Sequence, residues 1–153
     1  MAVLYMSETS SNHSIPMRHA DFESLVEALD YAATGQTGMN FYDRRSQLVS
    51  SFEYRMLKRR ALMGARRLLG LGLVRGDRVA LIADTNVTFV EVFFACQYAG
   101  LIPVPLPIPM GVGQHSSYVD KLRGLLSSCS PAAVCGGEEW LPLVREAAAD
   151  LPP

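Results

Sequence analysis

The 153-residue chain contains, at residues 71–106, the sequence LGLVRGDRVALIADTNVTFVEVFFACQYAGLIPVPL. Arg78–Ala83 is a short apolar run between turn residues, which is typical of a strand buried on both faces of a parallel sheet. Asn86 is a good N-cap for a helix that ends at Gly100, and Leu101–Leu106 follows as a second strand. Apolar residues surround most of this helix, so it is expected to be buried on most sides.

Prolines begin inside the second predicted strand, at Pro103 and Pro105, and continue as Pro107 and Pro109 after it. Proline has no N–H to donate to a sheet ladder. This strand is therefore expected to be short or to leave the sheet early.

The rest of the C-terminal half repeats the alternation of helix and strand. A helix is predicted to begin near Ser116 or Ser117, followed by a third short strand at Ala132–Cys135 and a last helix at Glu138–Ala149. The order strand, helix, strand, helix, strand, helix implies right-handed crossovers. The predicted fold class is α/β, with a mainly parallel sheet and helices on both faces.

The N-terminal half precedes this alternation. Residues 1–20 lack periodicity and are interpreted as a mobile leader. A helix is predicted from Asp21 to Gly35, because apolar residues recur at helical spacing and glycine can end a helix. Two short strands, Met39–Asp43 and Gln47–Phe52, are expected to form a hairpin. A long amphipathic helix is predicted from Glu53 to Gly70.

The composition excludes several classes of protein. Hydrophobic residues make up 49% of the chain and charged residues 19%, which argues against intrinsic disorder. The formal net charge of −1 gives no overall attraction to nucleic acid or anionic lipid. No stretch is long and apolar enough for a membrane span, and the first residues do not form a signal peptide. A soluble, cytoplasmic protein is expected.

The three cysteines, Cys96, Cys129 and Cys135, do not suggest a disulfide framework or a zinc site. Their number is odd, and no two of them form a C-x-x-C pair. Two of them lie in strongly apolar runs, where cysteine acts as a small core residue.

Three segments, in this order, resemble adenylate-forming (AMP-dependent synthetase/ligase) enzymes. FEYRML at Phe52–Leu57 partly matches the family's L-T-Y-x-E-L, through Tyr54 and Leu57. LGLVRGDRVAL at Leu71–Leu81 is similar to L-G-L-x-x-G-D-R-V-A-L, and YAGLIPVPL at Tyr98–Leu106 resembles x-A-G-x-x-x-V-P-L. These are scaffold residues, so the resemblance identifies a fold rather than a reactive centre.

Within this family the chain looks most like fatty-acyl-AMP ligases, because of the proline cluster after Pro103 and the long gap before the helix that carries Tyr118. The resemblance implies that residues 21–151 form the N-terminal α/β subdomain of an AMP-binding (adenylation) domain, truncated before its phosphate-binding loop.

The resemblance also implies a reaction for the complete enzyme. Such enzymes use ATP, usually with Mg²⁺, to convert a carboxylic (fatty) acid to acyl-AMP and pyrophosphate, and then pass the acyl group to an acyl-carrier protein or coenzyme A. The family's phosphate-binding loop, later acidic motifs and small C-terminal domain would all lie beyond residue 153. The chain alone is therefore expected to be inactive, with the remainder of the enzyme, in cis or in trans, as its partner.

No catalytic, cofactor-binding or metal-binding residue is predicted within the chain. Its only lysines, Lys58 and Lys121, lie in helical patterns, and neither follows a glycine-rich loop. Neither a G-x-x-x-x-G-K-[ST] nor a G-x-S-x-G motif occurs. The histidines, His13, His19 and His115, lack the spacing of metal ligands.

The sequence also admits other interpretations. An interaction module, or half of a split enzyme that docks a separately encoded remainder, is the main alternative. A stand-alone nucleotide-binding domain is less favoured, because Gly111–Ser116 nearly matches G-x-G-x-x-G but has serine in place of the third glycine. A flexible connecting loop is preferred there. The basic run Arg59, Arg60, Arg66 and Arg67 is interpreted as a solvated helix face rather than a phosphate-binding patch.

Overall fold

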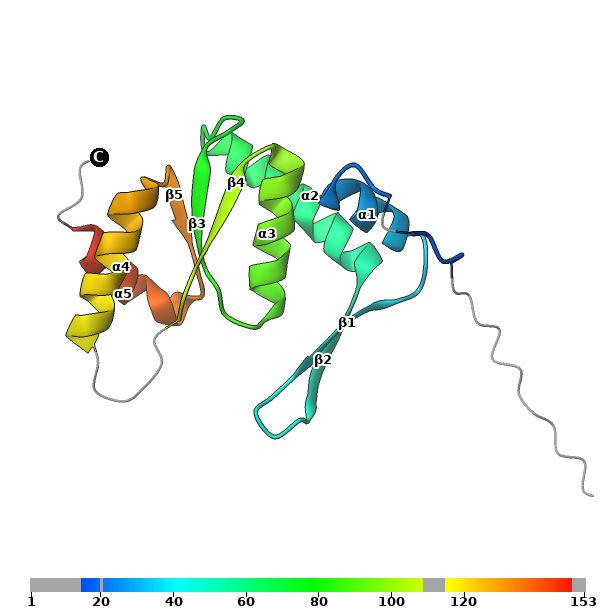
Figure 1. Ribbon diagram of the computed structural model, residues 1–153, viewed down its shortest axis with the longest axis horizontal. Coiled ribbons are helices and arrows are strands. Elements are labelled where there is room, and N and C mark those ends of the chain that lie inside the picture. Colours follow the sequence, from blue (N-terminus) through cyan, green and yellow to red (C-terminus); the bar gives the residue numbers. More distant parts are fainter. Residues whose placement is uncertain (1–14, 20, 109–114, 150–153) are drawn as a thin grey trace, which may run out of the picture.

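A three-stranded parallel sheet lies between two layers of helices (Figure 1). The sheet contains β3 (Arg78–Ile82), β4 (Ile102–Leu106) and β5 (Ala133–Cys135), in the order β4-β3-β5. This arrangement confirms the predicted α/β class with helices on both faces. The structure is a computed structural model that describes residues 15–19, 21–108 and 115–149.

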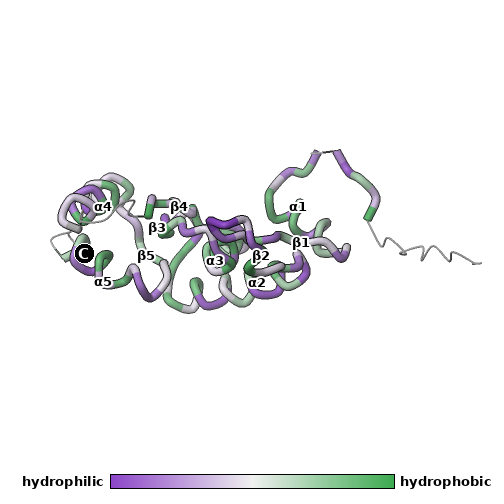
Figure 2. Tube along the Cα trace, turned by 90° about the horizontal axis from the view of Figure 1, so that it is seen from below, coloured by the Kyte–Doolittle hydropathy of each residue, from purple (hydrophilic) through white to green (hydrophobic). Residues whose placement is uncertain are grey.

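The helices are divided between the two faces of the sheet (Figures 1 and 2). On one face lies α3 (Val87–Ala99), with α2 (Tyr54–Gly70) packed on its far side. The other face is covered by α4 (His115–Cys129) and α5 (Leu141–Ala148). The last helix, predicted to begin at Glu138, begins at Leu141 instead, because Glu138–Trp140 forms a single 3-10 turn before α5.

β3 supplies both hydrophobic layers. Its residues Ala80 and Ile82 pack among α4 and α5, while Val79 and Leu81 pack among residues of α2 and α3. Successive side chains of a strand point to opposite faces, so an uninterrupted apolar run can be buried on both. All four side chains are buried, as the sequence predicts.

The prolines of β4 do not take this strand out of the sheet early. β4 pairs with β3 over all of its five residues. The Ile102 amide donates to the Asp77 carbonyl at 2.8 Å, so the backbone groups of Ile102 face β3. Backbone groups alternate in direction along a strand, and Pro103 and Pro105 therefore turn their nitrogen atoms away from β3. No ladder donor is lost at either position.

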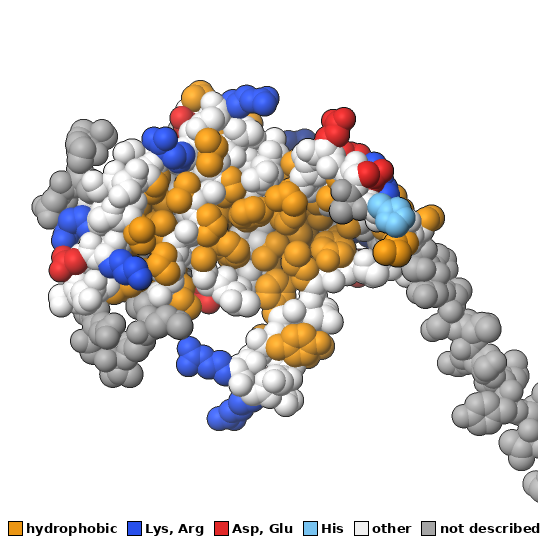
Figure 3. All heavy atoms as spheres, viewed as in Figure 1, with side chains coloured by type: hydrophobic (Ala, Val, Ile, Leu, Met, Phe, Trp, Pro, Cys, Tyr) orange, Lys and Arg blue, Asp and Glu red, His pale blue; other side chains and the backbone are white. Residues whose placement is uncertain are grey.

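The predicted ends of α3 are confirmed. The Phe89 amide donates to Asn86 Oδ1 at 2.9 Å, and Gly100 ends the helix at φ 70°, a left-handed conformation suited to glycine. The prediction that α3 is buried on most sides is confirmed: Ala95 and Cys96 are buried, and only Thr88 of this helix is exposed. The sheet and α2 cover two sides of the helix, and hydrophobic side chains spread over the middle of the face drawn in Figure 3.

Asn86→Ala is expected to lower the free energy of unfolding by about 1 kcal/mol, because it removes the side-chain acceptor for the first turn of α3. Urea unfolding followed by circular dichroism measures the change. Asn86→Ser, which keeps an acceptor at this position and adds no charge beside Asp84, is the control and should recover most of the loss. Equal losses in the two variants would show that the cap contributes little.

The N-terminal part forms a helix and a hairpin. α1 (Leu25–Ala32) begins later than predicted, because Ser24 is its N-cap and accepts a hydrogen bond from the Glu27 amide. The predicted hairpin is confirmed as β1 (Gly38–Tyr42) paired antiparallel with β2 (Leu48–Glu53). Residues 15–19 form neither helix nor strand, and the rest of the predicted leader lies outside the described residues.

Candidate functional site

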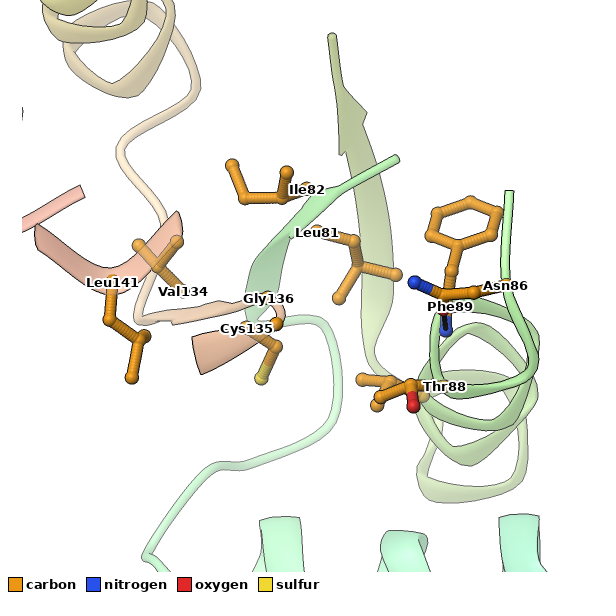
Figure 4. Close-up of a pocket in the computed structure, with 11 residues that line it drawn as sticks. Leu81, Ile82, Asn86, Thr88, Phe89, Val134, Cys135, Gly136 and Leu141 are labelled. Atoms are coloured by element: carbon orange, nitrogen blue, oxygen red, sulfur yellow. Dashed lines mark hydrogen bonds between the residues drawn. The ribbon is translucent and has the colours of Figure 1, made fainter. Parts of the chain in front are cut away.

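A cavity of about 360 Å³ opens at the carboxyl ends of β3 and β5 (Figure 4). Leu81 and Ile82 line it from β3, Cys135 and Gly136 from the end of β5, and Phe89 from the first turn of α3. The chain leaves β3 through α3 to reach β4 on one side, and continues through α4 to β5 on the other. The cavity therefore lies at a topological switch point, where open α/β sheets usually bind ligands.

The lining of this cavity is mostly apolar, and the Asn86 side chain is already hydrogen-bonded within the protein. Asn86 accepts from the Phe89 amide, and its side-chain amide donates to the Asp84 carboxylate at 3.0 Å. Neither lysine nor arginine is among the residues that line it. The cavity can accommodate an apolar group, but it offers no cation to neutralise a triphosphate.

Neither Lys58 nor Lys121 is among the residues that line the cavity. Within residues 15–19, 21–108 and 115–149, no group of three or more His, Cys, Asp or Glu side chains is placed to hold a metal ion. Lys58 pairs with Asp30 at 3.1 Å, and Lys121 is exposed on α4. Lys58 therefore takes part in an ion pair between α2 and α1, and Lys121 is in contact with solvent.

His19 is not among the residues that line the cavity. His19 is exposed near the N-terminus, and His115 begins α4. His13 and the glycine-containing residues 111–114 lie outside the described part of the chain. The structure therefore does not test the dinucleotide-binding interpretation of that loop.

The cavity itself was not predicted, although one sequence signal points to it. Gly136 and Gly137 directly follow the third predicted strand. A Cβ at Gly136 would lie 2.9 Å from Ile82 Cγ1, so a side chain there would collide with the end of β3. The glycine pair directly after the third predicted strand is therefore the sequence feature that could have indicated the cavity.

A second hollow, the α2/α3 groove, has a volume of about 430 Å³ and also reaches β5. Its apolar lining comes from Met63 and Leu68 of α2, Val92 and Ala95 of α3, and Cys135 of β5. At its rim Arg60 pairs with Glu91, Nη1 to Oε1 at 2.7 Å.

The basic run of α2 is a solvated face, as predicted: Arg59, Arg60, Arg66 and Arg67 are all exposed. Arg60 pairs with Glu91 and also places its guanidinium 5.3 Å from the centre of the Phe52 ring. The face therefore follows the amphipathic pattern of the helix.

The thiols of Cys96 and Cys135 lie in the same hydrophobic layer, between α3 and the sheet. Burial, with a smaller contribution from Cys135, raises the pKa of Cys96 to about 12. Burial also raises the pKa of Cys135. Both groups are therefore neutral thiols near pH 7, and the thiolate that acts as a nucleophile is scarce.

The raised pKa of Cys96 predicts a loss of stability in alkaline solution. The folded protein holds this proton more tightly than the unfolded chain, so its contribution is complete below the unfolded pKa, near 9, and falls as pH rises toward about 12. The decrease in the free energy of unfolding above pH 9 should be smaller in Cys96→Ala than in the parent. Denaturant titrations from pH 7 to 10.5 measure it, with Cys129→Ala as control. Identical pH profiles for Cys96→Ala and the parent would contradict the prediction.

No helix in the described residues combines the length and the apolar character needed to cross a membrane.

Comparison with known proteins gives consistent matches. A model of the family "AMP-binding enzyme" matches residues 32–147. A putative acyl-CoA synthetase of Caulobacter vibrioides (strain NA1000 / CB15N) is 43% identical over 135 residues, which are 88% of this chain and 23% of that protein. A long-chain-fatty-acid–AMP ligase, FadD32, of Mycolicibacterium smegmatis is 39% identical over 71 residues, 46% of this chain and 11% of that protein.

Solved structures agree with these relatives. A fatty acyl-adenylate ligase, from a study of the E. coli and L. pneumophila enzymes, superposes with a TM-score of 0.85 at 65% identity, over 90% of this chain and 25% of that chain. A fatty acid AMP ligase from Legionella pneumophila has a TM-score of 0.66 at 22% identity over 80% of this chain and 21% of that chain, which shows the shared fold alone.

The chain spans about a quarter of the length of the Caulobacter synthetase and of the fatty acyl-adenylate ligase. All of these matches are to enzymes or enzyme-like proteins, and they give no support to the alternative of an interaction module. The family match covers residues 32–147, from α1 to α5, and so includes the whole sheet. The chain belongs to the AMP-binding enzyme family.

Proposed function

We propose that residues 21–151 are the N-terminal α/β subdomain of an acid-activating enzyme most like the fatty-acyl-AMP ligases. The complete enzyme would use ATP and Mg²⁺ to convert a fatty acid to acyl-AMP and pyrophosphate. The observation that carries this proposal is the superposition on a fatty acyl-adenylate ligase, with a TM-score of 0.85 at 65% identity over 90% of the chain.

In this proposal the chain supplies framework and no reacting group. Transfer to AMP requires cations and donors placed against the charge that develops on the phosphates. The cavity at the carboxyl ends of β3 and β5 has an apolar lining without lysine or arginine, and Lys58 is paired with Asp30. The groups that bind and activate ATP would then come from outside residues 1–153.

The partners follow from the same proposal. They are the remainder of the adenylating enzyme, a fatty acid, and either an acyl-carrier protein or coenzyme A as acceptor. The proposed location is the cytoplasm, where ATP and these acceptors are available.

Exchange of radioactive pyrophosphate into ATP, dependent on added fatty acid, tests the proposal. The chain alone should show none. A chimera in which residues 1–153 replace the matching quarter of the 65%-identical ligase should show exchange, with the intact ligase as control. Exchange by the isolated chain would contradict the framework role. A folded, monodisperse chimera that gives no exchange with fatty acids of any length would contradict the enzymatic role.

A further inference from the structure

The end of α2 and the turn that follows it expose apolar side chains that the core does not use. These residues, 66–75, read RRLLGLGLVR and are named here the α2–β3 corner. Leu68 and Leu73 are buried in the hydrophobic layer that contains α3, so they hold the corner against the core. The other large apolar side chains face solvent: Leu69 is 46% exposed, Leu71 78% and Val74 62%.

Arginines flank these exposed apolar side chains. Arg66, Arg67 and Arg75 are all exposed, and within the described part of the chain none of them forms an ion pair with a carboxylate. Residues three and four apart are neighbours on a helix surface, so Arg66 lies beside Leu69 and Arg67 beside Leu71. Three arginines and no acidic residue give the corner a charge of +3, whereas the whole chain carries −1.

Hydrogen bonds fix the shape of the corner. The Val74 amide donates to Asp77 Oδ2 at 2.8 Å, and the Gly76 amide donates to the Gly100 carbonyl at 2.9 Å. Gly72 has φ 91°, a left-handed conformation that glycine adopts without strain. The apolar and basic side chains are therefore held on a defined turn, and the first acidic residue after the corner, Asp77, is engaged in closing that turn.

The corner lies at the amino end of β3, whereas the cavity lies at the carboxyl ends of β3 and β5 (Figure 1). Leu69, Leu71 and Val74 line neither this cavity nor the α2/α3 groove. Along the upper edge of the molecule in Figure 3, hydrophobic and basic side chains lie next to each other. A projecting turn of this kind fits a flat partner, and a partner bound there leaves the cavity open.

We propose that the α2–β3 corner binds the surface of a membrane that contains anionic phospholipids. The three exposed apolar side chains would enter the boundary between head groups and acyl chains, and the three arginines would face the head-group phosphates. Exposed apolar side chains with basic neighbours are the combination that binds such a surface. This inference goes beyond the proposed function and does not depend on it.

The charge and shape of the corner decide between occupants. A second copy bound through the same corner would bring like charges together, which opposes association. An anionic lipid surface attracts the arginines, each of which strengthens binding by about fivefold. An acidic protein would attract them too, but it would need a matching pocket for each apolar side chain, whereas a fluid lipid surface adapts to a convex turn.

Binding of the 153-residue chain to lipid vesicles tests the proposal. Vesicles made of equal parts phosphatidylcholine and phosphatidylglycerol should bind the chain about tenfold or more tightly than vesicles of phosphatidylcholine alone. Added salt should reduce this difference, because it screens the arginines from the phosphates. Co-sedimentation with the vesicles measures the bound fraction.

A pair of apolar variants locates the contact. Leu71→Ser combined with Val74→Ser should weaken binding to the mixed vesicles by about tenfold or more, because two apolar side chains no longer enter the lipid. Leu48→Ser combined with Val49→Ser is the matched control on the hairpin, where these residues are 54% and 67% exposed. The control should change binding by less than about twofold. Far-ultraviolet circular dichroism checks that both variants are folded.

A pair of charge variants tests the corner even if the apolar variant fails to fold. Arg66→Gln combined with Arg75→Gln should weaken binding to the mixed vesicles by about 25-fold at low salt. Arg44→Gln combined with Arg45→Gln lowers the net charge of the chain equally, but at the exposed turn of the hairpin. This control should lose less than about fivefold, because its charges lie away from the proposed contact.

Three outcomes would overturn the proposal. Equal binding to the two kinds of vesicle would exclude an anionic lipid surface and leave an acidic protein as the better match to the charges. Equal losses in the corner and hairpin variants would show that the corner is not the contact. Self-association of the chain without lipid, measured by sedimentation velocity and abolished by the Leu71 and Val74 substitutions, would identify a second copy as the occupant. None of these measurements requires pyrophosphate exchange, so failure of the proposed function would leave the result unchanged.

Discussion

Leu57→Ala is expected to lower the free energy of unfolding by about 2–5 kcal/mol, the usual range for truncating a fully buried leucine. Leu57 lies on α2, is completely buried, and packs with Leu29 and Phe52. This small hydrophobic cluster joins α1, the hairpin and α2. The truncation removes apolar contacts and leaves a cavity. The surrounding helices can close this cavity only in part, because their other contacts hold them in place.

Urea unfolding at constant pH measures this loss, and Leu62→Ala is the matched control. Leu62 lies on the same helix with 37% of its surface exposed. Its truncation should cost less than about 1 kcal/mol, because much of the side chain contacts water in the folded state. Equal losses at the two positions would mean that the cluster around Leu57 does not hold α2 in place.

Gly64→Val is expected to destabilise the protein by about 3 kcal/mol, because it overfills the contact between α2 and α3. A Cβ at Gly64 would lie 2.8 Å from Ala95 Cβ, well inside van der Waals contact. The two helices would have to separate, and α3 also forms part of the cavity at the ends of β3 and β5. A small residue is therefore needed at this crossing.

Gly70→Val provides the control for Gly64→Val. Gly70 lies at the end of α2, and a Cβ there would meet no atom within 4 Å. Valine has a higher helix propensity than glycine, so this variant should be neutral or slightly stabilising, within about 0.5 kcal/mol of the parent. Thermal unfolding of the two variants gives the comparison. Similar melting temperatures would show that the α2–α3 contact tolerates a larger side chain.

Local signals predicted most of the elements correctly. β3 follows from an apolar run between turn residues, and the ends of α3 follow from Asn86 and Gly100. These features depend on hydrogen bonds and backbone preferences within a few residues, so neighbouring residues are enough to specify them. The three segments that resemble adenylate-forming enzymes lie in the same part of the chain, and the family match confirms them.

Features that depend on distant partners could not be predicted in the same way. The β4 prolines are one example, because only the pairing with β3 shows that their nitrogen atoms face away from that strand. The start of α1 at Leu25 is different: its cap, Ser24, is a local signal that was missed because apolar spacing extends the pattern back to Phe22. The apolar circumference of α3 shows what this helix can bury but not which surfaces cover it: the sheet and α2 on one side, and the cluster of Leu29, Phe52 and Leu57 on another.

The amino-acid sequence was sufficient for the α/β alternation, the family and the absence of a lysine-bearing phosphate loop, because each depends on residue types in a fixed order. The cavity at the switch point and the outward position of the β4 prolines became visible only in three dimensions. They depend on strand order and on the direction of each backbone group, and the order of strands across a sheet is set by the packing of residues far apart in the chain.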